Sequence, residues 1–152
     1  MGLGNKIPKV AIVSGYFNPL HEGHLDFIEA AHELADSVAV IVNNDKQVKM
    51  KGSKVLYDEQ TRLRIISALK KVDYAIVSID KDSSVANSIK KIVNDLSYSK
   101  EYGSVDFLFV NSGDRVGETN PKESKVCQKL DIMQIGIHMP KVNSSSSIKE
   151  KI

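Results

Sequence analysis

The sequence predicts an α/β fold, a doubly wound domain built on a mainly parallel sheet of five strands. Two observations predict it. Five short apolar runs, rich in β-branched residues, alternate along the chain with segments in which apolar residues recur at helical spacing. The runs are apolar on both faces, which is typical of parallel strands covered by helices on both sides. Since the 152 residues contain no long linker, we expect residues 1–152 to form one domain.

The first half of the chain is expected to contain three strands and two helices. Val10–Val13 is short, β-branched and bounded by Gly15, as buried strands are. Asp58 is a helix-capping residue type and precedes an apolar helical pattern. In chain order we expect a strand at 10–13, a helix with Leu25, Ile28, Ala31 and Ala35 inward, a strand at 38–42, a basic loop at 46–55, a helix from about Asp58 with Leu63, Ile66 and Leu69 inward, and a strand at 74–79.

The second half is expected to add two helices and two strands. Val85, Ile89, Ile92, Val93 and Leu96 recur at helical spacing. After that helix we expect a polar connection at 97–104, a strand at 105–110, a short helix near 122–130, a strand near 132–137 and a tail at 143–152 that begins with a serine run.

Composition narrows the classes of function. The net charge is +2, so the overall balance gives no support to a nucleic-acid partner. No apolar run approaches the roughly 18 residues of a membrane span, and residues 1–8 lack the apolar core of a secretion signal. The single cysteine, Cys127, excludes an internal disulfide and fits a reducing compartment. We expect Cys127 to be a small buried hydrophobic residue. We therefore expect a cytoplasmic protein.

Polar segments follow three of the predicted strands. They are Gly15–His24, Asn43–Asp45 and Asn111–Arg115. In parallel α/β sheets, ligands bind outside the carboxyl ends of the strands, which is where these segments would meet. The sequence therefore predicts a binding pocket at this edge of the sheet.

The first polar segment suits phosphate. It leads from a strand through a Gly/Asn/Pro turn into a helix whose start carries His21 and His24. Helix starts expose unpaired N–H groups and the positive end of the helix dipole. Two histidines three residues apart lie on one face of the helix and add two donors. Transfer of a phosphoryl group needs such donors and in-line positioning, and it needs no covalent nucleophile from the protein.

The same segment resembles a family signature. Gly15 to His24 is similar to the G-x-F-D-x-x-H-x-G-H motif of the cytidylyltransferase-like nucleotidyltransferases. The resemblance covers roughly residues 8–152 and includes further motifs in the family's order. These are Asn43–Asp45 after the second strand, Lys49–Gly52 as a lysine-bearing loop, Glu59–Arg62 with Ala68–Asp73 as E-x-R…A-L-x-x-V-D, Ser112–Arg115 as G-G-D, and Ser144–Lys149 as S-[ST]-[ST]-x-I-[KR].

The resemblance implies a single Rossmann-like domain that transfers a nucleoside monophosphate to the phosphate of a small phosphorylated alcohol or sugar and releases pyrophosphate. CMP from CTP is the first expectation. The resemblance also implies Mg²⁺ with the nucleoside triphosphate, and a homodimer. Asn18 stands where many members have Asp, and the family's adenylyltransferase branches accept Asn there. An ATP-dependent adenylyltransferase acting on a sugar phosphate, pantetheine phosphate or a flavin is therefore the alternative. A nucleotide-binding module without turnover is the second alternative.

Roles carry over from the family by position. His21 and His24 would hold the triphosphate in the transition state. Lys51, or its neighbour Lys49, would reach the phosphates, and Arg62 would clamp them with its planar guanidinium. The resemblance further implies a nucleotide site lined by Gly15, Tyr16, Phe17, Asn18 and Gly23, with Asp114 and Arg115 near the base and ribose, Ser144, Ser145 and Ser146 on phosphate, and Asp45 toward the substrate.

Several of these residues have plainer interpretations that the sequence leaves open. Lys49 and Lys51 could belong to a solvated loop. Arg62 could be an exposed helix residue, as Arg64 is expected to be. Asp45 could cap a turn.

The histidines and the serine run have alternatives too. His21 and His24 could be surface histidines or zinc ligands, although an i,i+3 pair without a nearby third Cys or His is poor zinc chemistry. The serine run at 144–147 could be a disordered tail. His32 and His138 are expected to be structural.

Overall fold

The computed structural model describes residues 8–99, 103–112 and 120–139. The first half of the chain forms β1 (Lys9–Gly15), α1 (Glu22–Glu33), β2 (Ser37–Val42), α2 (Asp45–Met50), α3 (Glu59–Ser67) and β3 (Tyr74–Val77). The second half forms α4 (Ala86–Leu96), β4 (Tyr98–Ser99), β5 (Gly103–Ser104), β6 (Asp106–Ser112), α5 (Pro121–Lys129) and β7 (Met133–Ile137).

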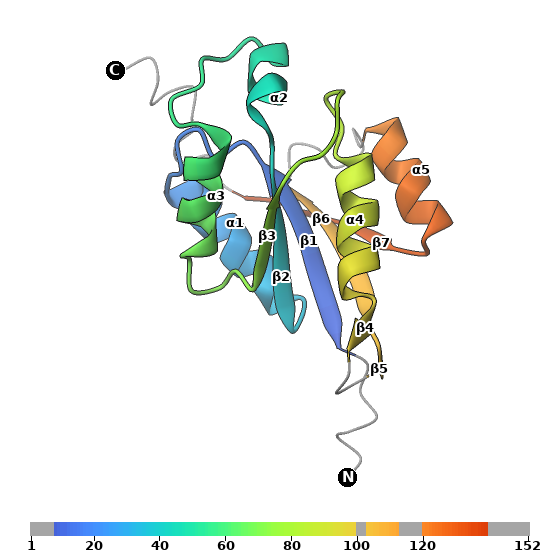
Figure 1. Ribbon diagram of the computed structural model, residues 1–152. Coiled ribbons are helices and arrows are strands. Elements are labelled where there is room, and N and C mark those ends of the chain that lie inside the picture. Colours follow the sequence, from blue (N-terminus) through green and yellow to red (C-terminus); the bar gives the residue numbers. More distant parts are fainter. Residues whose placement is uncertain (1–7, 100–102, 113–119, 140–152) are drawn as a thin grey trace.

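Five of these strands form one sheet in the order β3-β2-β1-β6-β7 (Figure 1). Every neighbouring pair in that sheet is parallel. The predicted α/β class with a five-stranded parallel sheet is therefore confirmed. The strands β2 and β3 lie on one side of β1, and β6 and β7 lie on the other. The order of the strands therefore reverses between β1 and β6, which is where open α/β sheets form their ligand crevice.

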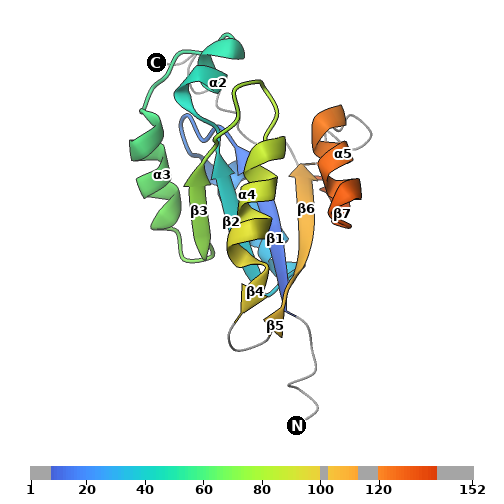
Figure 2. The same cartoon turned by 45° about the vertical axis from the view of Figure 1, so that its right-hand side comes forward.

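Helices cover both faces of the sheet (Figures 1 and 2). On one face, α1 and α3 pack against Ala11 and Val13 of β1. On the other face, α4 and α5 pack against Val10 and Ile12 of the same strand. Successive residues of a strand point to opposite faces, so a run that is apolar at every position can serve two cores.

The register of the strands brings their carboxyl ends to one edge. Gly15 at the end of β1 pairs with Val42 at the end of β2, and Val42 pairs with Val77 at the end of β3. The segments that follow these three strands therefore start side by side.

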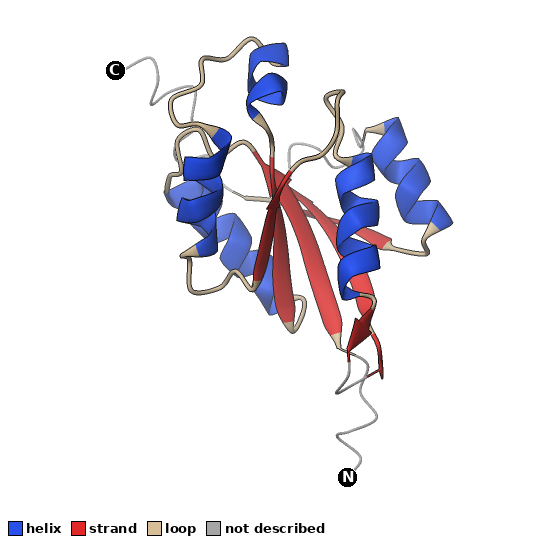
Figure 3. Cartoon of the chain, in the orientation of Figure 1, coloured by secondary structure: helices blue, strands red, loops and turns tan. Residues whose placement is uncertain are grey.

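The prediction of a basic loop at 46–55 is wrong for the first half of that segment, because α2 occupies Asp45–Met50 (Figure 3). Local hydrogen bonds explain why α2 forms. The backbone N–H of Gln47 donates to Oδ1 of Asn44 at 2.9 Å, and the Asn44 N–H donates to Oε1 of Gln47 at 3.0 Å. This reciprocal cap satisfies two N–H groups at the start of a helix that has almost no apolar periodicity. The polar connection at 97–104 likewise contains the antiparallel pair β4–β5.

Two smaller observations complete the fold. Cys127 is fully buried, and burial raises the pKa of its thiol to about 11, so it stays protonated at neutral pH. In the described parts of the chain, the longest apolar helical stretch falls short of what crossing a membrane requires.

Candidate functional site

The turn between β1 and α1 holds two histidines by backbone hydrogen bonds. His21 is the N-cap of α1, and its Nδ1 accepts from the N–H of Gly23 at 3.1 Å. The N–H of His21 in turn donates to Nδ1 of His24 at 3.2 Å. A neutral imidazole that accepts at Nδ1 carries its proton on Nε2. Both rings are therefore held as Nε2–H donors.

The two imidazole rings lie face to face. Their centroids are 3.8 Å apart and their planes differ by 26°. The edge of the Phe17 ring meets His24 at 5.0 Å between centroids. As the i,i+3 spacing predicted, the two histidines share one face at the start of the helix.

Both rings are neutral at physiological pH. Burial lowers the pKa of His24 to about 3, with smaller contributions from the nearby charges of His21 and Lys51. Burial also lowers the pKa of His21. The pair therefore offers hydrogen-bond donors and carries no positive charge of its own.

Lysine charge reaches this turn from the end of α2. The Lys51 ammonium lies 4.3 Å from the centre of the Tyr16 ring, in a cation–π contact. Tyr16 belongs to the segment that leads into His21. Lys49 is exposed on the last turn of α2. Of the two lysines, Lys51 is the one that the fold brings to the histidine-bearing turn.

Arg62 is buried behind the same turn, with 1% of the residue exposed. Its Nε donates to the carbonyl of Tyr57 at 2.9 Å, and Nη1 donates to the carbonyls of Tyr16 and Asn43. Its Nη2 lies 2.6 Å from Oδ1 of Asp45. The guanidinium thus joins the turn after β1, the end of β2 and the starts of α2 and α3.

This placement decides between the interpretations of Arg62. It is not an exposed helix residue, whereas Arg64 is exposed as expected. Its donors face protein carbonyls and a carboxylate, which is the geometry of an anchor for the turn. Direct contact with a phosphate stays a prediction. Asp45 does not cap α2, because Asn44 does.

Asn18 is a second anchor for the turn and is 1% exposed. Its Nδ2 donates to the carbonyl of Lys54 at 2.8 Å, and its Oδ1 accepts from the N–H of Leu56 at 2.8 Å. The Asn18 side chain therefore fixes the turn to the 54–57 segment, and the Arg62 side chain fixes it to α2 and α3.

Gly15 leaves room for Phe17. A Cβ on Gly15 would lie 2.7 Å from Cζ of the Phe17 ring. Phe17 itself is buried and has a φ of 49°, in the left-handed region. The turn thus needs a residue without a side chain at its start.

Gln47, for which the sequence predicted no role, joins Asn43 and Asn44 in an amide cluster that supports α2. Asn43 Nδ2 donates to Oε1 of Gln47 at 3.0 Å. Gln47 Nε2 donates to the carbonyls of Asp82 and Ser84, and Asn44 Nδ2 donates to those of Ser78 and Asp80. The Asn-x-x-Gln spacing was the available signal, since it is a capping-box pattern. The cluster binds the segment after β2 to the segment after β3.

The remaining predicted residues fall in two groups. Asp114, Arg115 and the serines Ser144, Ser145 and Ser146 lie outside the described residues, so their roles stay predictions. His32 is half-buried in α1 and His138 is exposed after β7. Within residues 8–99, 103–112 and 120–139, no three His, Cys, Asp or Glu side chains come together as a metal site.

Known proteins resemble this chain along nearly its whole length. Residues 12–151 match the model of the family described as cytidylyltransferase-like. An FAD synthase of Thermoplasma volcanium is 28% identical over 142 residues, covering 93% of this chain and 92% of the relative. An FAD synthase of Ferroglobus placidus is 39% identical over 88 residues, covering 58% of this chain and 56% of the relative.

A solved structure shares the fold. The lipopolysaccharide core biosynthesis protein from Thermoplasma volcanium GSS1 superposes with a TM-score of 0.64 at 25% identity. The match covers 90% of this chain and 99% of that one.

Proposed function

The chain belongs to the cytidylyltransferase-like family, and from that premise we propose that it is a nucleotidyltransferase that moves AMP from ATP to flavin mononucleotide. In this reaction an oxygen of the flavin phosphate attacks the α-phosphorus of ATP. The bond from that phosphorus to the bridging oxygen of the β-phosphate breaks. FAD forms and pyrophosphate leaves with the electron pair of the broken bond.

The names of the relatives support ATP and a flavin. Relatives named FAD synthase match this chain, one of them across 93% of its length. The sequence placed CTP first and kept the adenylyltransferase with a flavin among its acceptors as the alternative. These relatives move the preference to that alternative. A CTP-dependent transfer to a phosphorylated alcohol or sugar becomes the competing candidate in the test.

The stacked pair of His21 and His24 is the observation that carries the proposal. Each Nδ1 is occupied by a backbone N–H, which leaves each Nε2–H to donate. Charge in an in-line phosphoryl transfer develops on the phosphoryl and pyrophosphate oxygens, so donors aimed there lower the barrier. The positive end of the α1 dipole adds to them. No covalent nucleophile is needed from the chain.

The other residues of the turn receive supporting roles in this proposal. Lys51 would add positive charge toward the triphosphate. Gly15, Tyr16, Phe17, Asn18 and Gly23 form the turn against which the nucleotide would lie. Arg62 and Asn18 would hold that turn in shape. Asp114 and Arg115 would lie near the base and ribose, and Ser144, Ser145 and Ser146 would bind phosphate. Lys49 would be a further contact to the phosphates, and Asp45 would face the substrate.

Magnesium enters the proposal as part of the substrate, MgATP. Mg²⁺ is usually bound through substrate phosphates and water, with one or two carboxylates. Asp45, at the start of α2 beside the turn, is a carboxylate within reach of this region, and it is paired with Arg62. The described side chains thus fit an ion that arrives with the triphosphate, and chelation of Mg²⁺ should stop turnover.

The test is FAD formation, followed by chromatography, from FMN with ATP and from FMN with CTP. Pyrophosphate release is measured in parallel over a panel of phosphorylated alcohols and sugars with each triphosphate. FAD from the ATP reaction supports the proposal. Release with CTP and a panel member, without FAD, would replace it with the cytidylyltransferase. Tight binding of triphosphate without any release would replace it with a binding module. The predicted homodimer is tested separately by sedimentation velocity.

A further inference from the structure

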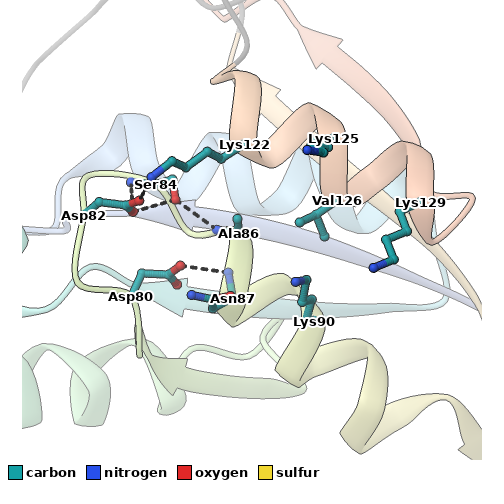
Figure 4. Close-up of a pocket in the computed structure, with 10 residues that line it drawn as sticks. All are labelled: Asp80, Asp82, Ser84, Ala86, Asn87, Lys90, Lys122, Lys125, Val126 and Lys129. Carbon is teal, nitrogen blue, oxygen red and sulfur yellow. Dashed lines mark hydrogen bonds and ion pairs between the residues drawn. The ribbon is translucent and has the colours of Figure 1, made fainter.

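A groove lies between α4 and α5 (Figure 4). These two helices cover the face of the sheet opposite α1 (Figure 2). Its volume is about 390 Å³. Cavities of this size hold small metabolites. The groove is lined by Asp80, Asp82, Ser84, Ala86, Asn87, Lys90, Lys122, Lys125, Val126 and Lys129.

The two carboxylates of the groove are already satisfied. Asp80 is 4% exposed, and it accepts the N–H groups of Asn87 at 2.8 Å and Ser88 at 2.9 Å. Asp82 bonds the ammonium of Lys122 and the hydroxyl of Ser84, and these bonds lower its pKa to about 2. Both carboxylates therefore already have partners within the protein, although the Asp82 side chain is partly exposed.

Three ammonium groups remain. Lys90 comes from α4, and Lys125 and Lys129 come from α5. Figure 4 shows Lys129 extending from α5 toward the α4 side, where Lys90 lies. Among the described residues, none of the three has a carboxylate partner. Lys125 and Lys129 are also four residues apart on one helix, a spacing at which like charges repel.

The floor between these lysines is apolar. Val126 is 8% exposed and Ala86 is 7% exposed, and both belong to the core on this face. Lys90, Lys125 and Lys129 are all exposed, and an anion in the groove would offset the mutual repulsion of their positive charges. The geometry points to a ligand that carries charge toward both helices at once.

We propose that the groove between α4 and α5 is a second anion site, separate from the histidine site, that binds a small molecule bearing at least two phosphate groups. Two phosphate groups would let one ligand pair with the unpaired ammonium groups of both helices at once. The carboxylates of Asp80 and Asp82 would repel a further phosphate at their part of the groove, which disfavours a nucleic-acid strand. The whole chain's net charge of +2 disfavours it as well.

The site does not depend on the proposed reaction. His21 and His24 start α1 on one face of the sheet, and the groove lies on the other face. A failed transferase assay would therefore not count against an anion site in the groove. Absence of anion binding in the groove would not count against the transferase.

The experiment uses tripolyphosphate as the probe. Backbone amide shifts of the full chain are followed by NMR during its titration, at low and at high salt. We expect saturable shifts at Asn87, Lys90 and Val126, in addition to any around the histidines. In the triple variant Lys90→Gln/Lys125→Gln/Lys129→Gln, the affinity read from the groove shifts should fall about tenfold or more, since each ion contact contributes a fraction of the binding. High salt should weaken wild-type binding in the same direction.

The control is Lys70→Gln/Lys71→Gln, which removes two charges, against three in the triple variant, from the turn before β3, outside the groove. It should keep most of the affinity at the groove. Equal weakening in the control would mean that only the overall charge matters, and this would overturn the site. Shifts confined to the surroundings of His21 and His24 in the wild-type protein would overturn it without any variant. Tighter binding of a short RNA than of tripolyphosphate at the same amides would overturn the class of ligand.

Discussion

Nη2 of Arg62 lies 2.6 Å from Oδ1 of Asp45, so a buried guanidinium in α3 holds the first residue of α2. The same guanidinium donates to the carbonyls of Tyr16 and Asn43. Two segments that follow different strands are therefore fixed by one side chain. The shape of the histidine-bearing turn depends on a residue 38 positions beyond His24 in the sequence.

Replacing Arg62 with methionine should destabilise the protein strongly. Removing one partner of a buried ion pair leaves the other charge and the bonded carbonyls unsatisfied. Asp45 is partly exposed, which moderates the loss, so we expect about 3 kcal/mol in the free energy of unfolding. Urea denaturation measures it. Arg62→Lys should remain folded and lose turnover, because a point charge cannot reach all of these acceptors.

Arg64→Met is the matched control, since Arg64 is exposed on the same helix, and it should change stability by less than about 0.5 kcal/mol. The kinetics of Arg62→Lys distinguish a residue that holds the turn in shape, an anchor, from one that binds phosphate directly. A fall in kcat with little change in KM for ATP supports an anchor. An unchanged stability together with a raised KM for ATP would instead support direct contact with phosphate.

His21→Asn should separate the helix cap from the proposed chemistry. Asparagine is a good N-cap and can accept the Gly23 N–H, but it has no donor where Nε2–H lies. We expect stability within about 1 kcal/mol of wild type and turnover reduced by roughly 10²–10³-fold, the loss typical of one transition-state donor. Thermal unfolding and FAD formation are measured on the same preparation.

His21→Ala is the comparison, because it also removes the cap and should lose about 1 kcal/mol of stability. His24→Ala should show the same collapse of turnover. If His21→Asn turns over like the wild-type protein, the imidazole has no role beyond capping α1.

Stability should fall on mild acidification because of His24. The pKa of its folded form is lowered to about 3, whereas an ordinary histidine titrates near 6.5. Below pH 6.5 the unfolded chain takes up a proton that the folded chain refuses, so the free energy of unfolding decreases as pH falls toward 3. Above pH 6.5 this contribution is fully present. Urea midpoints between pH 7.5 and 4.5 measure the slope.

His24→Asn should have a shallower slope over the same range. His138→Asn, at an exposed position after β7, is the control and should keep the wild-type slope. Parallel slopes for wild type and His24→Asn would show that the buried imidazole does not carry the effect.

Gly15→Ala should disturb the site through Phe17. The new Cβ would lie 2.7 Å from the Phe17 ring, which is buried and meets His24 edge-on. Overpacking of this kind costs about 1–3 kcal/mol, and we expect turnover to fall with it. Phe17→Leu removes the ring end, so the cost of Gly15→Ala should be smaller in that background. An equal cost in both backgrounds would place the strain elsewhere.

The sheet, most helices and the position of the histidines could be predicted from the sequence because their signals are local. Runs such as Val38–Val42 specify strands through burial on both faces, and Asp58 specifies a helix start through its cap, as observed. The spacing of His21 and His24 places them together on any helix. These features depend on residues within one or two turns of one another.

The role of Arg62 and the existence of α2 could not be predicted in the same way. Arg62 stands in a polar stretch of sequence, and its burial depends on carbonyls supplied by turns far along the chain. α2 has one local signal, the capping-box spacing of Asn44 and Gln47, but the same two side chains also bind it to the segment after β3. Such long-range polar pairing has no periodic signature.

The uncharged state of the stacked imidazoles has a calorimetric consequence. A bound phosphate raises a neighbouring histidine's pKa by about 1–3 units, and from a starting value of about 3 for His24 the ring still carries no proton at pH 7.5. Capturing the triphosphate should thus draw almost no protons from the buffer through this residue. His24 should therefore contribute nothing to any difference in the heat of association between phosphate-free buffers of different ionisation enthalpy.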